Sequence, residues 1–300
     1  MINSLSILLP SYNNCCTALV KALQTQAATI PYKAFRYEII VADDGSTDAR
    51  IINQNIAVND LPHCRFICRQ HNTGRAAIRN FLAQQAQYDY LLFIDSDRKL
   101  GNTDFIARYV ALDGIEVACG GLTVQGNPEL LCHNIRYQLE TLYEQHNSAA
   151  ERQQRAYSNF NTSNFLTRRD ILLAIPFDER FKKYGYEDVL WGKALRQHHV
   201  DIMHINNPIV LDDFESNAAF VAKMEEGMDT LHTFQYELRG YSRLIASADK
   251  LQRYHLKHLA AGLFGCVKKS IKANLTGNKP SLFLFNIYKL GLLIAKDYQR

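Results

Sequence analysis

Two aspartates one residue apart follow an apolar run in the stretch LLFIDSD, residues 91–97. A short apolar run predicts a buried strand, so we expect Asp95 and Asp97 at the carboxyl end of that strand. Carboxylates gathered at one place repel each other unless a cation lies between them, and oxygen ligands suit Mg²⁺ and Mn²⁺. The alternative is a strand end with solvated aspartates, one of which caps the next element.

Two earlier polar clusters follow apolar runs in the same way. LSILLP leads into residues 10–13, and YEIIVADDGSTD ends in acidic and turn residues at 43–46, which an Asx turn alone also explains. Helical periodicity lies between the runs, in CCTALVKALQTQA and GRAAIRNFLAQQA. This alternation predicts a mostly parallel sheet flanked by helices. Ligands of such sheets bind beyond the carboxyl ends of the strands, so the three clusters should converge on one crevice.

A second pair of acids lies in GYEDVLWGKAL, residues 185–195. Apolar residues at helical spacing predict a helix that begins here, with Glu187 and Asp188 in its first turn. Acids there interact favourably with the helix dipole, which alone accounts for them. A carboxylate can also act as a general base that removes the proton of an attacking hydroxyl group. The residues themselves leave both interpretations open.

Taken in order, these motifs resemble those of the family 2 glycosyltransferases, which have the GT-A fold. SILLPSYNN, EIIVADDGSTD, HNTGRAAIRN and LLFIDSD are similar to the successive nucleotide-binding motifs of that family. The resemblance continues through NTSNFLTRR and FDERFKKYGYEDVLWGKALRQ. It implies a catalytic domain over residues 1–215, with a nucleotide-binding half at 1–100 and an acceptor half at 101–215. Residues 216–300 would form a helical C-terminal extension.

The resemblance also implies roles for individual residues. Asp44 would accept a hydrogen bond from the base, most often uracil, and Asp95 would meet the ribose side. Asp97 would ligate Mn²⁺ or Mg²⁺ that bridges the diphosphate. Asp188 would be the base of an inverting transfer, with Glu187 holding an acceptor hydroxyl group. The other nucleotide contacts that it implies are Pro10, Tyr12, Asn13, Gly74, Arg79 and Ser96.

Two further positions are candidates for sugar contacts, and one departs from the family pattern. The resemblance places Asn164 near the donor sugar, while Trp191 is a candidate either for a sugar ring or for the core. Many relatives carry a histidine in a stretch like NPVxH, which can complete the metal shell. This chain has NNPIVLDDFESN, with Leu211 at the matching position. Either Asp212 replaces the histidine as a ligand, or water fills the place, or metal binding is weaker.

Composition narrows the class of function. The 300 residues carry a formal net charge of only +4, which gives no reason to expect a nucleic-acid partner. Seven cysteines without a C-x-x-C pair and a start without signal-peptide layout favour free thiols and the cytoplasm. No apolar stretch reaches transmembrane length. The first apolar run is followed by no glycine-rich loop, which disfavours sugar-nucleotide synthesis and dinucleotide chemistry.

The last fifty residues combine Leu, Phe and Ile with Lys and Arg. Such a basic amphipathic tail predicts peripheral contact with the cytoplasmic leaflet of a membrane; packing on the catalytic domain or on a second subunit is the alternative. The expected function is transfer of a sugar from a nucleotide-diphosphate sugar to a saccharide or lipid-linked acceptor, in cell-surface polysaccharide synthesis. The alternative is a catalytically silent relative that binds nucleotide or partners within an assembly complex. The oligomeric state is left open.

Overall fold

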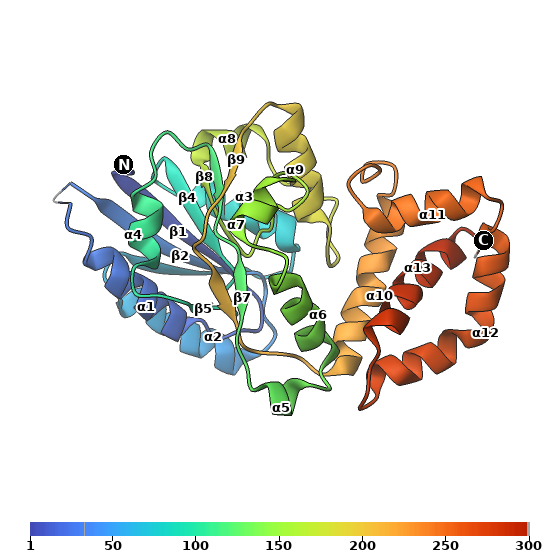
Figure 1. Ribbon diagram of the computed structural model, residues 1–300. Coiled ribbons are helices and arrows are strands. Elements are labelled where there is room, and N and C mark those ends of the chain that lie inside the picture. Colours follow the sequence, from blue (N-terminus) through green and yellow to red (C-terminus); the bar gives the residue numbers. More distant parts are fainter. Residues whose placement is uncertain (33, 299–300) are drawn as a thin grey trace. The chain divides into compact units, whose positions relative to one another are not determined.

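The residues of the predicted site follow strands of one seven-stranded sheet (Figure 1). Its strand order is β3-β2-β1-β4-β8-β6-β9. The computed structural model describes residues 1–32 and 34–298. Neighbouring strands are parallel except at β8, which runs antiparallel to both β4 and β6. The strands are β1 (Ser4–Ser11), β2 (Arg36–Asp43), β3 (Cys64–Cys68), β4 (Tyr90–Ile94), β6 (Val117–Cys119), β8 (Asn164–Arg168) and β9 (Ile202–His204).

The first four strands end at one edge of this sheet. Ser11 of β1 pairs with Asp43 of β2, which in turn pairs with Cys68 of β3. On the other side of β1, β4 ends at Ile94, and the antiparallel β8 places Asn164 beside it. The residues that follow β1, β2 and β4 therefore share one edge. This confirms the predicted α/β class with a mostly parallel sheet.

Helices cover both faces of the sheet. Alternate residues of β1, including Leu5 and Ile7, are fully buried in a cluster with apolar side chains of α1 and α4, and α3 packs on β1 and β2. A strand buried on both faces needs an almost continuous apolar sequence, which the runs around β1, β2 and β4 have. The helices of this unit are α1 (Thr17–Ala28), α2 (Ala49–Ile56), η1 (Ala57–Asp60), α3 (Arg75–Gln85), α4 (Phe105–Val110), α7 (Ala149–Gln153), α8 (Arg169–Ala174) and α9 (Glu187–Gln197).

A small second sheet follows the DSD motif directly. Its order is β5-β10-β7, from β5 (Lys99–Leu100), β10 (Ile209–Leu211) and β7 (Leu122–Val124). Lys99 pairs with Val210 in antiparallel register. The chain after the DSD motif is thereby brought beside the chain that leads into Asp212.

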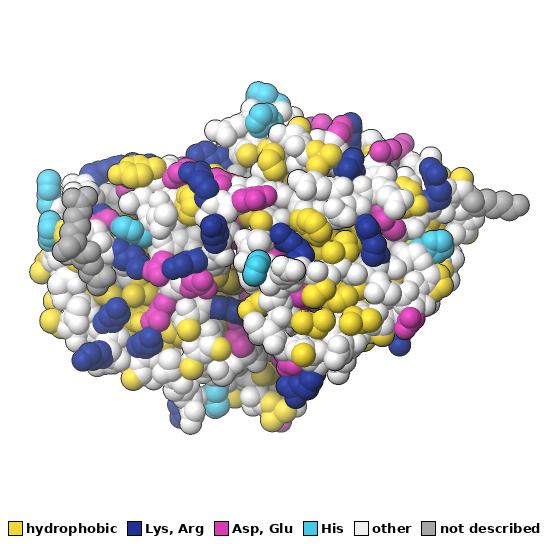
Figure 2. Space-filling view, turned by 180° about the vertical axis from the view of Figure 1, so that it is seen from behind, with side chains coloured by type: hydrophobic (Ala, Val, Ile, Leu, Met, Phe, Trp, Pro, Cys, Tyr) yellow, Lys and Arg dark blue, Asp and Glu magenta, His cyan; other side chains and the backbone are white. Residues whose placement is uncertain are grey.

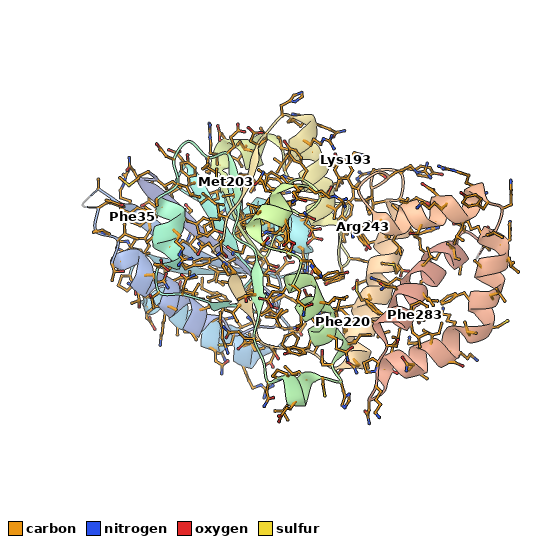
Figure 3. All side chains as sticks on the ribbon, viewed as in Figure 1. Phe35, Lys193, Met203, Phe220, Arg243 and Phe283 are labelled. Atoms are coloured by element: carbon orange, nitrogen blue, oxygen red, sulfur yellow. The ribbon has the colours of Figure 1, made fainter. Side chains whose placement is uncertain are left out.

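The remaining helices form a second compact unit, built from residues 126–145, 183–186 and the segment from Asp213 onward. In this unit Phe220 of α10 stacks on Phe285 of α13, whereas Phe283 is exposed (Figure 3). The predicted helical C-terminal part is present, and none of the described helices is long and apolar enough to span a membrane. The predicted domain boundaries stay predictions. The helices are α5 (Pro128–Leu131), α6 (Ile135–Glu144), α10 (Asn217–Thr233), α11 (Arg243–Arg253), α12 (Lys257–Thr276) and α13 (Leu282–Lys296).

Candidate functional site

Asp95 is held firmly at the end of β4. Its backbone N–H donates to the carbonyl oxygen of Ser163 at 3.0 Å, and its Oδ2 accepts from Ser163 Oγ at 2.7 Å. Its Oδ1 accepts from Arg79 Nη2 at 2.8 Å. Burial alone would raise the pKa of Asp95, but the guanidinium groups of Arg79, Arg98 and Arg75 outweigh it and keep this pKa below its usual value. Asp95 is therefore ionised at neutral pH, with both oxygens engaged.

Arg79 connects the DSD motif with the acids that open α9. Its side chain is only 2% exposed, and its Nη1 lies 3.4 Å from Glu187 Oε1 while Nη2 binds Asp95. The predicted nucleotide contact of Arg79 stays a prediction, because in this structure the guanidinium is buried between two carboxylates and its Nη1 and Nη2 both face acids. Its observed contacts are those of a residue that positions both acidic clusters.

Asp188 has the electrostatics of a base that works near neutral pH. Burial, and then the negative charge of Glu187, raise the pKa of Asp188 from 3.8 to about 7. Its Oδ1 accepts a hydrogen bond from Val189 N–H at 2.8 Å. Glu187 is buried and engaged with Arg79. A carboxyl group with a pKa near the working pH can both take and release a proton efficiently.

Asp44 fixes the loops that follow β2 and β3. Its carboxylate accepts from Arg69 Nη1 at 3.0 Å, from Thr73 Oγ1 at 2.9 Å, and from the backbone N–H groups of Thr73 and Gly74 at 3.0 and 2.9 Å. Four donors fill the acceptor positions of a carboxylate. Gly74 takes part with a φ of +93°, a backbone conformation that favours glycine. Recognition of a base by Asp44 stays a prediction, and it requires the exchange of one of these donors.

Asn13 joins the loop after β1 to the DDGSTD loop. Its backbone N–H donates to Ser46 Oγ at 2.7 Å, and its Oδ1 accepts from Thr47 N–H at 2.9 Å. Beside it, Tyr12 is exposed and Pro10 is half-buried. Tyr12 thus presents its ring to solvent at this edge of the sheet. The predicted nucleotide contacts of all three residues stay predictions.

The central residue of the DSD motif is tied to the same loop. Asn14 Nδ2 donates to the carbonyl oxygen of Ser96 at 2.7 Å, and it also lies 3.4 Å from Ser96 Oγ. Ser96 itself is buried. The loop after β1 therefore contacts both the DDGSTD loop and the DSD motif, so the predicted clusters do come together at one edge.

Asp97 is the one acid of the DSD motif with substantial solvent access. Its side chain is 50% exposed, and its Oδ2 lies 3.3 Å from Arg98 Nη1. The other predicted metal ligand, Asp212, is ion-paired with Lys99. Within residues 1–32 and 34–298, no group of three or more His, Cys, Asp or Glu side chains could hold a metal ion.

The donor set decides which kind of metal site fits. Asp95 is occupied by Arg79 and Ser163, so Asp97 is the carboxylate that remains accessible. A Mg²⁺-type ion is commonly held by one or two carboxylates together with substrate phosphates and water. The residues present fit such a substrate-completed site. The prediction that Asp212 replaces the missing histidine stays a prediction, and it requires the carboxylate to leave its ion pair with Lys99.

Trp191 belongs to the core. It is 2% exposed, its ring stacks on that of Phe177 with centroids 4.8 Å apart, and its Nε1 donates to the carbonyl oxygen of Ile175 at 2.7 Å. No face of the indole is left for a sugar. This packing agrees with the core alternative, and the predicted sugar contact of Trp191 stays a prediction without support from it.

Asn164 is equally unavailable to a sugar. It is 1% exposed, and its Nδ2 donates to the carbonyl oxygens of Gly121 and Asn207 at 3.0 and 2.8 Å. Its Oδ1 accepts from the Tyr109 hydroxyl group at 2.6 Å. The amide links the start of β8 to the loops after β6 and β9. The predicted donor-sugar contact of Asn164 stays a prediction without support from these contacts.

Three charged or polar residues of this edge escaped the sequence analysis. Arg69 and Thr73 donate hydrogen bonds to Asp44, and Arg98 Nη1 lies 3.3 Å from Asp97 Oδ2. A signal existed for two of them, because Arg69 follows an apolar run directly and Arg98 follows the DSD motif directly. Basic residues next to clustered acids at strand ends are candidates for the counter-charge that such clusters need.

Comparison with known proteins shows which family these motifs match. Residues 6–111 match the family described as glycosyl transferase family 2. The teichoic acid poly(glycerol phosphate) polymerase of Staphylococcus epidermidis is 25% identical over 194 residues, which cover 61% of this chain and 25% of the relative. An uncharacterized glycosyltransferase of Haemophilus influenzae is 34% identical over 107 residues, which cover 35% of this chain and 38% of the relative. The chain thus spans well under half of the length of these curated relatives.

Solved structures share the fold. Staphylococcus aureus TarS 1–349, crystallised in complex with UDP-GlcNAc, superposes with a TM-score of 0.53 at 16% identity, covering 99% of this chain and 91% of that one. The mannosyltransferase PcManGT from Pyrobaculum calidifontis, in complex with GDP-Man and Mn²⁺, gives a TM-score of 0.53 at 11% identity, covering 98% and 86%. At these identities the likeness shows the fold alone. The chain has the GT-A fold, and its residues 6–111 match the family described as glycosyl transferase family 2.

Proposed function

We propose that this chain is a glycosyltransferase that moves a sugar, with inversion, from a nucleotide-diphosphate sugar to a hydroxyl group. The observation that carries the proposal is the buried Arg79, which binds Asp95 at the end of β4 and Glu187 at the start of α9. One arginine thereby positions two acidic clusters with different chemistry, one fully ionised and one with a carboxyl pKa near neutral. The family match of residues 6–111 supports the same reaction class.

The donor would bind beyond the carboxyl end of β4. Asp97 would hold Mn²⁺ or Mg²⁺ together with diphosphate oxygens, and the metal, when bound, would offset the negative charge of the leaving group. The complex of PcManGT with GDP-Man and Mn²⁺ supports a divalent cation, and the complex of TarS with UDP-GlcNAc supports a UDP-sugar. We propose UDP as the nucleotide, and a saccharide or lipid-linked acceptor in cell-surface polysaccharide synthesis.

Asp188 would act as the base of the transfer. The acceptor hydroxyl group gives its proton to Asp188 as its oxygen attacks the anomeric carbon from the face opposite the diphosphate. The bond between the anomeric carbon and the phosphate oxygen breaks, and the nucleoside diphosphate leaves with the electron pair. Attack from the opposite face inverts the anomeric configuration. Glu187 contributes by raising the pKa of Asp188 toward the working pH.

Release of nucleoside diphosphate tests this proposal. Purified protein is incubated with a panel of UDP-, GDP- and dTDP-sugars, Mn²⁺ and candidate acceptors, and the released nucleotide is quantified. We expect release from one nucleotide class and a loss of roughly 10²- to 10⁴-fold in Asp188→Asn, the range for a general base. Asp60→Asn changes an exposed aspartate and should retain full activity. Equal activity of Asp188→Asn and wild type would refute the assigned base.

We also propose that the helical unit contacts an anionic membrane surface at the cytoplasmic face. On α12 the side chains of Leu259, Leu263 and Val267 follow helical spacing and are 61%, 61% and 45% exposed. Residues 251–296 contain no Asp or Glu and eight Lys or Arg. Figure 2 shows Lys and Arg side chains interspersed with hydrophobic ones. Each basic side chain near an anionic surface contributes about 1 kcal/mol.

Vesicle flotation tests the membrane proposal. The full chain should float with vesicles rich in phosphatidylglycerol and not with pure phosphatidylcholine, and salt should release it. Leu259→Ser with Leu263→Ser should abolish flotation. Leu130→Ser, which changes a leucine that is 79% exposed on α5, is the matched control. If the double variant floats as well as the control, or if it dissociates a dimer instead, the membrane assignment is wrong.

A further inference from the structure

Two consecutive basic residues engage both acids that were predicted to bind metal. Arg98 Nη1 lies 3.3 Å from Asp97 Oδ2, and Lys99 is ion-paired with Asp212. The two cations differ in environment, because the Arg98 side chain is 8% exposed and that of Lys99 is 71% exposed. Arg98 is therefore buried at this edge of the sheet, whereas Lys99 is a surface residue.

The hydrogen-bonding capacity of Arg98 is not filled by the chain. Its Nε is buried and has no hydrogen-bond partner, and its Nη1 reaches the Asp97 carbonyl oxygen only at 3.5 Å. A guanidinium group carries five N–H donors, and leaving buried donors unsatisfied is costly. An arginine with unsatisfied N–H donors directly after the DSD motif is suited to bind a ligand that supplies several acceptor oxygens.

The neighbouring charges indicate which ligand this is. Asp95 accepts its side-chain hydrogen bonds from Arg79 and Ser163, and Asp97, which lies 3.3 Å from Arg98, is half-exposed. Neither carboxylate therefore fills the hydrogen-bonding capacity of Arg98. The fork of an arginine matches phosphate oxygens in a bidentate manner, with charge-assisted hydrogen bonds. A diphosphate beyond the end of β4 would supply both the charge and the acceptors.

We infer that Arg98 is a direct contact of the donor diphosphate, which turns its N–H donors from Asp97 to phosphate oxygens and so supplies affinity that needs no metal ion. The inference rests on the proposed function, because it takes the nucleotide-diphosphate sugar as the ligand. It has two consequences. Nucleoside diphosphate binding persists when metal is removed, and Asp97 is released to the metal only when the diphosphate is bound.

Calorimetric titration of UDP into wild type and Arg98→Gln, each in Mn²⁺ and in EDTA, tests the inference. Wild type should bind UDP in EDTA with measurable affinity. Arg98→Gln should weaken binding in EDTA by roughly 10- to 100-fold, the usual effect of losing a charge-assisted contact, and should weaken it less in Mn²⁺. Uridine, which lacks phosphates, should bind both proteins equally.

Two further variants keep the test decisive. Arg108→Gln removes an exposed arginine that pairs with Asp104 and should change nothing. Arg98→Lys keeps the charge and loses the planar fork, so it should bind UDP in EDTA with intermediate affinity, even if thermal unfolding shows Arg98→Gln to be misfolded. If wild type binds UDP in Mn²⁺ but not in EDTA, or if Arg98→Gln binds like wild type in EDTA, the inference is overturned while the proposed function stands. If no nucleotide binds wild type in either buffer, the proposed function itself fails.

Discussion

Arg79 Nη2 lies 2.8 Å from Asp95 Oδ1, with the arginine almost completely buried. This pair ties α3 to the carboxyl end of β4, and the second nitrogen of the same guanidinium reaches Glu187 at 3.4 Å. The acid cluster assigned to the donor and the cluster assigned to the acceptor therefore depend on one side chain. A substitution of Arg79 should therefore affect the positions of both clusters.

Replacement of Arg79 by Met should destabilise the protein strongly. The change leaves Asp95 and Glu187 without their buried counter-charge, and removing one partner of a buried ion pair typically costs about 3–5 kcal/mol. Arg50→Met, which breaks a solvent-exposed pair with Asp48, should change the stability far less. Urea unfolding of both variants measures the difference. Equal losses would show that the buried pairs contribute no more than a surface pair.

The rate of transfer should rise with pH and level off above about pH 7. Asp188 acts as a base only when it is deprotonated, and its pKa is raised to about 7, so each pH unit below that value should reduce the rate about tenfold. In Glu187→Gln a negative neighbour is removed, which lowers the pKa of Asp188 and should move the half-maximal pH downward. A pH–rate profile of both proteins at saturating donor checks this. A profile that is flat between pH 5 and 8 would contradict the assignment of Asp188.

Asp188→Asn should stabilise the fold at pH 8 and not at pH 3. Because folding raises the pKa of Asp188 from 3.8 to about 7, the folded state binds more protons than the unfolded state within that window, and stability falls as the pH rises through it. Asparagine does not ionise and escapes this loss. Thermal unfolding at the two pH values, with Asp60→Asn as control, measures the effect. The same shift at both pH values would show that ionisation of Asp188 is not its cause.

Gly45→Ala should be more damaging than Gly114→Ala. Both glycines have positive φ, +75° and +63°, so both substitutions carry the strain of a left-handed backbone, about 1–2 kcal/mol. A Cβ on Gly45 would also lie 2.5 Å from the backbone carbon of His71, whereas one on Gly114 would meet nothing within 4 Å. Chemical denaturation of both variants should show the additional cost. If the two lose the same stability, the close approach of the two loops does not constrain the site.

The sequence was sufficient to predict that three polar clusters share one edge of the sheet. Apolar runs that end in polar residues indicated the carboxyl ends of β1, β2 and β4, and the alternation of strand and helix indicated that these ends share an edge. These patterns are local in the sequence. Because the carboxyl ends of parallel strands lie at one edge of the sheet, the patterns also predict which residues lie close together. The acids at the start of α9 followed from another local pattern, apolar residues at helical spacing that predict a helix beginning there.

The direction of individual side chains was beyond the reach of the sequence. Lys99 and Asp212 are 113 residues apart and meet because β5 and β10 pair, so no local pattern announces that Asp212 is neutralised. Asn164 has the polarity of a binding residue, but its amide is used up by backbone groups on two other loops. Trp191 follows helical spacing, which fits a core face as well as a sugar-facing one. In each case a contact between residues far apart in the sequence determines which groups the side chain faces, and only the folded structure shows that contact.

The central claim is that this edge of the sheet binds a nucleoside diphosphate, and calorimetry tests it most directly. UDP, GDP and dTDP are titrated in Mn²⁺ into wild type, Asp97→Ala and the surface control Asp60→Ala. One nucleotide, expected to be UDP, should bind wild type and the control equally and should bind Asp97→Ala at least tenfold more weakly. If none of the three binds, or if Asp97→Ala binds as tightly as wild type, the site assigned here is not the donor site.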